Sequence, residues 1–426
     1  MASQINQTSP DPAITTTTID YDHTPSLSAQ VIANNDDLLT EILVCLPIKS
    51  LLKFKSVSKH WLSLITTTNF YFRRTPFPHT ATGLFAVAYL GLKHSWLHFI
   101  SLEKNSELFG GCRHYNPLTS LPFPENKSSC ISQSSNGLLL IRTPLGSYYN
   151  RIKNSEKNFF VANPTTMQYA MLPRPAACSG STKNGFIFNL AFDPSKSIHY
   201  KVVCVRKIDH SDQQYYQIEI YSSATRTWKL SGGPLDAPFD IGSSNHGNSC
   251  DGVFWNGAVN WISKRHSLLY FNLEEEQLNE MPLPFNPERS NMSFMYFGES
   301  RDHLHLITMF KRKTQFDVYE MERDYSNWFV KFRVDLSEVA SVYPQRNIGA
   351  RLPLQEGLRN YFFYTVMSVV RREIEEESYM VLHIEKGIIV YYFKTSTFKK
   401  LLDTGIMGYG SNCHPYIESL APIYRL

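Results

Sequence analysis

The sequence lacks the motifs by which common enzymes and membrane proteins are recognised. It has no Gly-x-Ser-x-Gly, His-Glu-x-x-His or phosphate-binding glycine loop, so no pattern indicates a serine hydrolase, a zinc protease or a nucleotide enzyme. No apolar run is long enough to span a bilayer, and the N-terminus shows no basic stretch followed by an apolar one. We therefore expect neither a membrane partner nor secretion.

Cysteines are few and scattered through the chain. There are seven among 426 residues, an odd number, and none forms a Cys-x-x-Cys pair. A disulfide framework would need an even set at regular spacing. The pattern favours a reducing compartment, and we expect the protein in the cytoplasm, the nucleus or both.

The sequence also lacks a large excess of basic or acidic residues. Lys and Arg number 42 against 38 Asp and Glu, which gives a formal net charge of +4. There is no compact basic stripe, so nucleic acid is not a predicted partner. Lys49, Lys53, Lys55 and Lys59 recur at helical spacing beside apolar positions, and we interpret them as the solvated face of helices.

The N-terminal part divides into a polar tail and a helical module. Residues 1–30 are rich in Ser, Thr and Pro and offer little apolar surface, so we predict a disordered tail. In residues 31–76, Asn34 and Asn35 can cap a helix, and Pro47 can end one helix and open the next. Apolar residues then recur at intervals of three and four, including Phe54, Val57, Trp61 and Leu64, which predicts three helices. An isolated bundle of roughly forty residues usually needs a partner to complete its core.

The long remainder, residues 80–426, has the pattern of an all-β domain. Aromatic residues make up 13% of the chain, and segments of alternating hydrophobicity are separated by Asn, Gly, Pro and Asp turns. A degenerate strand–turn–strand unit recurs, with turns at 116, 163, 222, 272, 320 and 394. A spacing of roughly fifty residues predicts a kelch-like β-propeller. Six blades are expected, and the wider last interval leaves room for a seventh blade or a long loop.

Some residues invite a functional interpretation, but a structural one explains them better. Trp255 and Trp261 flank Asn256-Gly257, which predicts a tight hairpin that packs one blade on the next, and Trp228 and Trp328 are expected in blade cores. Asn163-Pro164 and Asn116-Pro117 are expected to form turns.

His303 and His305 share one face of a strand and resemble half of a metal site. Two candidate ligands alone are a weak signal, and Cys413-His414 is a similar pair. No metal, cofactor or catalytic residue is therefore predicted.

Residues 36–65 resemble the F-box. The similarity rests on Leu46-Pro47, on Val57-Ser58-Lys59 and on Trp61, which stand in the order expected of that family, although Asn34-Asn35 replaces the Leu-Pro with which many F-boxes open. The remainder resembles the F-box-associated domain of plant F-box proteins, through Asn163-Pro164, the segment 254–261 and the segment 416–420.

The resemblance implies a non-catalytic subunit of an SCF-type ubiquitin ligase. The helical module would bind a Skp-family adaptor, and through it a cullin and a RING protein. The propeller would bind a target protein that the sequence does not identify. The residues that the resemblance assigns to the adaptor contact are Leu38, Leu39, Ile42, Leu43, Leu46, Pro47, Ile48, Leu51, Leu52, Phe54, Val57 and Trp61. Some of these, such as Val57, are expected to pack within the module.

Two other functions remain open at this stage. One is an enzyme on a propeller scaffold, such as a kelch-type oxidase, for which the sequence shows no convergent metal ligands. The other is an F-box or propeller scaffold protein that binds partners without ligase function. The target would bind through connections between strands, for which the polar segments 142–158, 178–184, 231–251 and 341–357 are candidates.

Overall fold

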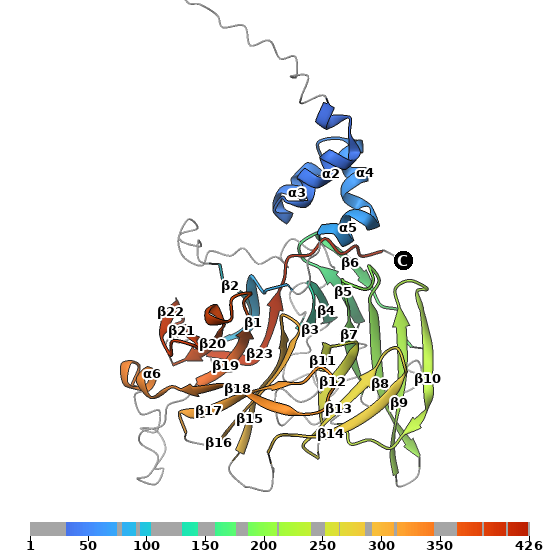
Figure 1. Cartoon of the computed structure of the whole chain (residues 1–426). Helices are drawn as coiled ribbons and strands as arrows, with labels where there is room; N and C mark the ends of the chain where they lie inside the picture. Colours follow the sequence, from blue (N-terminus) through green and yellow to red (C-terminus); the bar gives the residue numbers. More distant parts are fainter. Residues whose placement is uncertain are drawn as a thin grey trace, which may run out of the picture.

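The computed structural model describes most of the chain after the N-terminal tail. The described residues are 31–74, 79–90, 94–103, 130–143, 158–175, 186–210, 213–239, 252–263, 265–285, 292–310, 313–344, 364–385, 387–405 and 408–424. A group of short helices stands at one end of a large β domain (Figure 1). Within the described ranges, no helix has the length and hydrophobicity needed to cross a bilayer.

The helical module consists of α2 (Asp36–Val44), α3 (Ile48–Phe54), α4 (Lys59–Thr66) and α5 (Thr68–Arg74). Asn35 caps α2, because its side-chain oxygen accepts hydrogen bonds from the backbone N–H groups of Asp37 and Leu38, both at 3.1 Å. Pro47 precedes α3, as predicted. The three predicted helices correspond to α2, α3 and α4, and α5 follows them.

The predicted apolar repeat through Phe54, Val57 and Trp61 does not lie on one helix. The helix α3 ends at Phe54, and the Ser58 hydroxyl accepts a hydrogen bond of 3.1 Å from the backbone N–H of Trp61 to begin α4. A serine in this position competes with a continuous helix by bonding to the nearby backbone. The break places Val57 in the turn between the two helices.

The strands of the β domain form six antiparallel sheets, the blades of a propeller. Blade B contains β3 (Cys130–Ser135), β4 (Leu138–Thr143), β5 (Asn158–Asn163) and β6 (Gln168–Met171). Blade C contains β7 (Phe186–Ala191), β8 (Lys201–His210), β9 (Gln213–Ser222) and β10 (Thr227–Leu235). Blade D contains β11 (Val253–Trp255), β12 (Ala258–Ile262), β13 (Ser267–Asn272) and β14 (Gln277–Pro282). Blade E contains β15 (Met292–Ser300), β16 (His303–Phe310), β17 (Gln315–Met321) and β18 (Trp328–Asp335). Blade F contains β19 (Tyr364–Val370), β20 (Tyr379–Ile384), β21 (Gly387–Tyr392) and β22 (Phe398–Asp403).

Blade A closes the ring with strands from both ends of the chain. The strand β1 (Gly83–Leu90) pairs with β2 (His94–Ser101) on one side and with β23 (Gly408–Tyr416) on the other. The first strands of the blades, β23, β3, β7, β11, β15 and β19, follow one another in a closed ring. The six predicted blades are therefore confirmed. The wide interval between turns 320 and 394 holds the short helix α6 (Ser337–Val342) and residues 345–363, which lie outside the described residues.

The repeat seen in the sequence is the hairpin between the third and fourth strands of a blade. The turns at 163, 222, 272, 320 and 394 lie at or within two residues of the ends of β5, β9, β13, β17 and β21. Met167, Arg226, Glu276 and Ser396 each end such a turn with a positive φ between 53° and 61°. The turn at 116 lies outside the described residues.

The predicted Asn256-Gly257 hairpin is confirmed, and it has a counterpart in blade B. Trp255 pairs with Ala258 across it, and Asn256 and Gly257 have φ values of 50° and 77°, the signs that a type I′ turn requires. Asn136 and Gly137 make the same turn between β3 and β4, with φ values of 45° and 90°.

Tryptophan side chains join neighbouring blades, as predicted. Trp255 donates a hydrogen bond of 3.0 Å from its indole N–H to the Asp302 carbonyl of blade E, and Trp261 donates one of 2.8 Å to the Asn189 side chain of blade C. The Trp228 indole donates to the carbonyl of Pro173, beyond β6, at 2.7 Å. Trp328 is buried with Trp255 in one apolar cluster.

The closing strand β23 carries a buried histidine that predicts acid sensitivity. Burial lowers the pKa of His414 to about 4, although a bond with the backbone of Ile131 in blade B opposes the shift. In the unfolded chain a histidine takes up a proton near pH 6.5. The unfolded state therefore binds more protons between these values, and stability is lost as the pH falls through this window.

We predict that this one group lowers the free energy of unfolding by about 2 kcal/mol between pH 7 and pH 5. Urea unfolding of the wild type and of His414→Leu at both pH values measures the effect. The variant should show a smaller loss on acidification, and an equal loss in both proteins would contradict the assignment.

The candidate functional site: the helical module and its junction with the propeller

The core of the helical module is small and fully enclosed. Leu39, Leu43 and Leu51 are 3%, 0% and 0% exposed, and they pack with Ile65 of α4 and Phe70 of α5. These three leucines belong to the set predicted to contact an adaptor. In this conformation a partner cannot reach them without moving the helices, so they hold α2, α3, α4 and α5 together.

A second group of the predicted residues lies at the rim of this core. Leu46, Phe54 and Trp61 are half-buried and pack against it, and the Phe54 and Trp61 rings meet edge to face with centroids 5.2 Å apart. Ile48 and Leu52 are also half-buried. Their remaining surface stays available to a partner.

The third group is exposed. Leu38 and Ile42 are 45% and 46% exposed and stand one helical turn apart on α2, Pro47 is exposed, and Val57 is 59% exposed. The expectation that Val57 packs internally is wrong, because it lies in the turn between α3 and α4. Leu62 of α4 is exposed too, and sequence reasoning missed it, although it directly follows Trp61.

Polar contacts fix the helices to one another around this apolar surface. The His60 ring nitrogen lies 2.7 Å from the Asp36 carboxylate, and the Arg73 guanidinium pairs with Glu41. Arg74 donates a hydrogen bond of 2.6 Å to the carbonyl of Leu46, just before α3. Both ends of α2 are thereby tied to later helices.

The module also shares its core with the propeller. Residues 417–424, named here the C-terminal strap, follow β23 and run beneath α3 and α5 (Figure 1). Leu420 of the strap packs against the core of the module, and Tyr71 of α5 is buried in the apolar cluster between blades B and C. Lys49 of α3 forms an ion pair of 3.0 Å with Glu418. The module is thus completed in part by its own chain.

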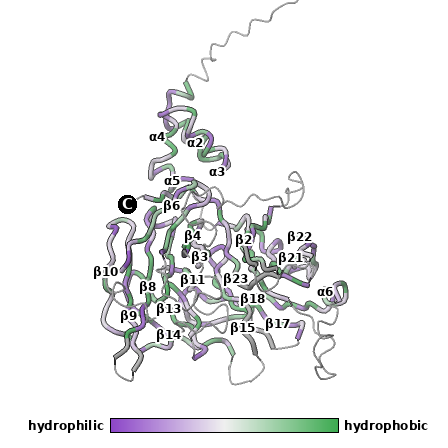
Figure 2. Tube along the Cα trace, turned by 180° about the vertical axis from the view of Figure 1, so that it is seen from behind, coloured by the Kyte–Doolittle hydropathy of each residue, from purple (hydrophilic) through white to green (hydrophobic). Residues whose placement is uncertain are grey.

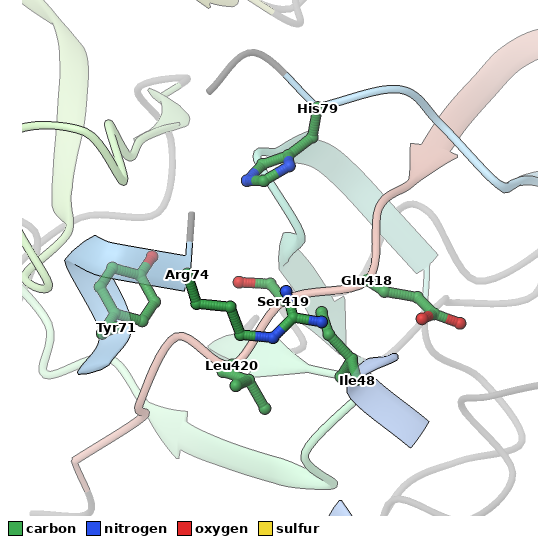
Figure 3. A pocket seen from close by; sticks show the side chains of 7 residues that line it. All are labelled: Ile48, Tyr71, Arg74, His79, Glu418, Ser419 and Leu420. Carbon is green, nitrogen blue, oxygen red and sulfur yellow. The ribbon is translucent and has the colours of Figure 1, made fainter. Parts of the chain in front are cut away.

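A shallow hollow marks this junction. Side chains of α3, α5 and the strap converge on it, together with His79 from the segment that leads into β1 (Figure 3). Burial lowers the pKa of His79, and the nearby Arg74 adds to the shift, so the uncharged ring is favoured. Burial also raises the pKa of the Tyr71 hydroxyl. The Tyr71 side chain is buried at this junction, whereas His79 and Arg74 are half-buried.

Blade B holds the strap through its backbone. The Asn163 amide donates hydrogen bonds to the carbonyls of Ser419 and Ala421, at 3.0 and 2.8 Å. The Thr165 hydroxyl accepts from the Ser419 N–H at 3.2 Å, and the Gln168 side chain accepts from the Ile423 N–H at 3.1 Å. Asn163 was predicted only as a turn residue, and no local pattern in the sequence signals its second role.

The histidine pair has an acidic neighbour after all. His303 lies 2.8 Å and His305 lies 3.5 Å from the Glu320 carboxylate, and Arg371 lies 3.5 Å from it as well. Burial raises the pKa of Glu320, but the bonds from the two histidines outweigh it and hold the pKa well below its usual value. The arginine gives this cluster the character of an ionic network. Among the described side chains, no group of three or more His, Cys, Asp and Glu residues could hold a metal ion.

The four connections predicted to bind a target lie mostly outside the described residues. Their flanking strand ends are described, however. The strand β4 runs from the Asn136-Gly137 turn, beside the strap, to Thr143, which pairs with Asn158 at the other end of blade B. The connection 142–158 therefore starts from the propeller face opposite the helical module.

Comparisons with known proteins agree with both parts of the chain. The family model described as the F-box domain matches residues 35–73, and the one described as the F-box associated beta propeller domain matches residues 116–423. An F-box protein of Arabidopsis thaliana is 35% identical over 396 residues, which cover 89% of this chain and 87% of that protein. An F-box/kelch-repeat protein of the same plant is 23% identical, over 67% of this chain and 74% of the relative.

Proposed function

This chain belongs to the F-box proteins that carry an F-box associated β-propeller domain, and on that premise we propose that it is the target-recognition subunit of an SCF-type ubiquitin ligase. Its F-box binds a Skp-family adaptor, which brings in a cullin and a RING protein. Its propeller binds the target protein. The chain supplies no catalytic residue, since its task is to hold two partners.

The observation that carries the proposal is the exposed apolar surface on a module too small to leave it uncovered. Leu38 and Ile42 are exposed one helical turn apart on α2, and the helical module that contains α2 stands outside the propeller (Figure 2). Burial of such a side chain against a partner contributes about 1.5–3 kcal/mol relative to full exposure. Helices that present apolar residues one turn apart are a common means of docking into a groove.

The propeller would act by raising the local concentration of the target. A protein bound to a rigid domain keeps its lysines near the ubiquitin thioester, so that an intermolecular step becomes effectively intramolecular. We place the target on the face opposite the F-box, where the connection 142–158 starts. We place the ligase in the cytoplasm, the nucleus or both, because the cysteine pattern favours a reducing compartment.

A pull-down with a purified Skp-family adaptor tests the proposal. Replacing Leu38 and Ile42 together by serine should reduce the retained adaptor at least tenfold, because two apolar contacts of more than about 1 kcal/mol each are lost. Met171→Ser is the matched control, since Met171 is 50% exposed on β6 of the propeller. Adaptor capture by the double variant equal to that of the control would refute the proposed docking surface.

A further inference from the structure

We propose that the C-terminal strap fixes the orientation of the F-box relative to the propeller and is therefore a positioning element of the ligase. The use of this orientation by a ligase rests on the proposed function, whereas the claim that the strap fixes the orientation does not. The strap lies more than 340 residues beyond the F-box in the sequence. Its residues nevertheless line one hollow together with residues of α3 and α5 (Figure 3).

The apolar contacts at the junction run in both directions. Leu420 leaves the propeller to pack against the core of the F-box, while Tyr71 leaves the F-box and is 6% exposed within the core between blades B and C. Tyr71 is thus buried in the propeller core, and the half-buried Leu420 packs against both the propeller core and the F-box core. Rotation of either domain would withdraw an apolar group into water, which opposes it.

The strap is itself held rigidly, although it has no regular secondary structure. Ala421 and Ile423 are 0% and 4% exposed, and the Ala421 N–H bonds to the Ser419 hydroxyl at 3.1 Å. Together with the bonds from Asn163, Thr165 and Gln168, this gives partners to the N–H groups of residues 419, 421 and 423 and to the carbonyls of 419 and 421. Blade B side chains thus bond the strap backbone at residues 419, 421 and 423.

The Asn136-Gly137 turn shows that the strap passes close to blade B. A Cβ atom added to Gly137 would lie 2.4 Å from the Cβ of Ser419 and 2.9 Å from the carbonyl oxygen of Ile417. The strap and the turn therefore fit only if position 137 carries no side chain.

Two attachments control orientation where one does not. The first is the covalent connection from Arg74 at the end of α5 to Gly83 at the start of β1. A connection by one segment allows a domain to swivel, and relative motion is the default for small interfaces. The strap supplies a second, non-covalent attachment, through the ion pair of Glu418 with Lys49 and the packing of Leu420 against the F-box core. Together they hold the F-box at one angle.

The sharpest test changes the Asn163 side-chain amide to a carboxylate, which keeps the acceptor oxygen and removes the N–H donors. In Asn163→Asp, the donors to Ser419 and Ala421 are lost, whereas the oxygen that accepts from the Thr165 and Thr166 N–H groups remains. Asn272→Asp is the control for the turn bonds, because the half-buried Asn272 accepts the same bonds from the Glu274 and Glu275 N–H groups in blade D, away from the strap. Only the first change releases the strap.

Orientation is measured as a distance distribution between spin labels. The labels are placed at Ser63→Cys on α4 and Ser337→Cys on α6, both exposed, in the full chain with its native cysteines replaced by alanine. The parent chain and Asn272→Asp should give one narrow distribution, and Asn163→Asp should give one at least twice as wide. Equal widths for the two aspartate variants would overturn the proposal.

Two further measurements, on Leu420→Ser and on adaptor capture, distinguish failure of this proposal from failure of the proposed function. Leu420→Ser, which leaves the Asn163 side chain and its hydrogen-bond partners in place, should also widen the distribution, and a width like that of the parent would count against the strap even if Asn163→Asp fails to fold. Adaptor capture by Asn163→Asp should stay within twofold of the parent, because α2 is unchanged. A parent chain that gives a narrow distribution but captures no adaptor refutes the ligase function and leaves the strap in place.

Discussion

Replacing Leu43 by alanine is expected to unfold the F-box while the propeller stays folded. Leu43 is 0% exposed at the centre of the module's core, and removing a buried leucine side chain costs about 2–5 kcal/mol. A module of four short helices has few other apolar contacts to compensate. Its adaptor capture should therefore be lost together with its structure.

Hydrogen exchange distinguishes this loss from the loss of a contact. In Leu43→Ala, amides of residues 36–74 should exchange fast while those of β20 and β21 in blade F stay protected. Leu38→Ala is the control on the same helix, because Leu38 is 45% exposed and a surface change of this kind costs within about 0.5 kcal/mol. Protection of residues 36–74 in Leu43→Ala equal to that in Leu38→Ala would show that the module does not depend on this core.

The blade count could be predicted because each blade repeats a local signal. A hairpin between the third and fourth strands needs a polar turn with a residue at positive φ, and such turns leave a mark that recurs with every blade. The Asn256-Gly257 turn was predictable for the same reason, since both positions need positive φ values. These features depend on residues close together in the sequence.

The division of the F-box residues could not be predicted, because periodicity identifies an apolar face without saying what covers it. Leu38 and Leu39 are neighbours with the same side chain, yet one is exposed and the other is 3% exposed. Val57 continued an apolar repeat, but the Ser58 cap moved it into a turn. Which apolar residues face the interior depends on how α2, α3, α4 and α5 pack, and that information is not local.

The strap and the ionic network were missed because they depend on contacts between distant residues. Asn163 has the composition of a turn residue, and its bonds to Ser419 and Ala421 appear only once blade A is closed by β23. Glu320 becomes a neighbour of His305 because the two pair across β16 and β17. Strand register is set by the folded sheet, so a sequence alone does not supply such pairs.

We expect the chain to assemble with a cullin and a RING protein through the adaptor. An F-box protein that serves a ligase must reach the cullin through the adaptor, whereas a scaffold protein would bind the adaptor and stop there. The two functions differ in an all-or-none way that does not require the target to be known. The propeller's partner can therefore be left out of the assay.

Size-exclusion chromatography of the purified chain with a Skp-family adaptor, a cullin and a RING protein distinguishes a ligase subunit from a scaffold protein. We predict that all four co-elute as one complex, and that omitting the adaptor, or replacing Leu38 and Ile42 by serine, leaves the chain eluting apart from the cullin. A complex of chain and adaptor that excludes the cullin would contradict the ligase function and indicate an F-box scaffold protein instead.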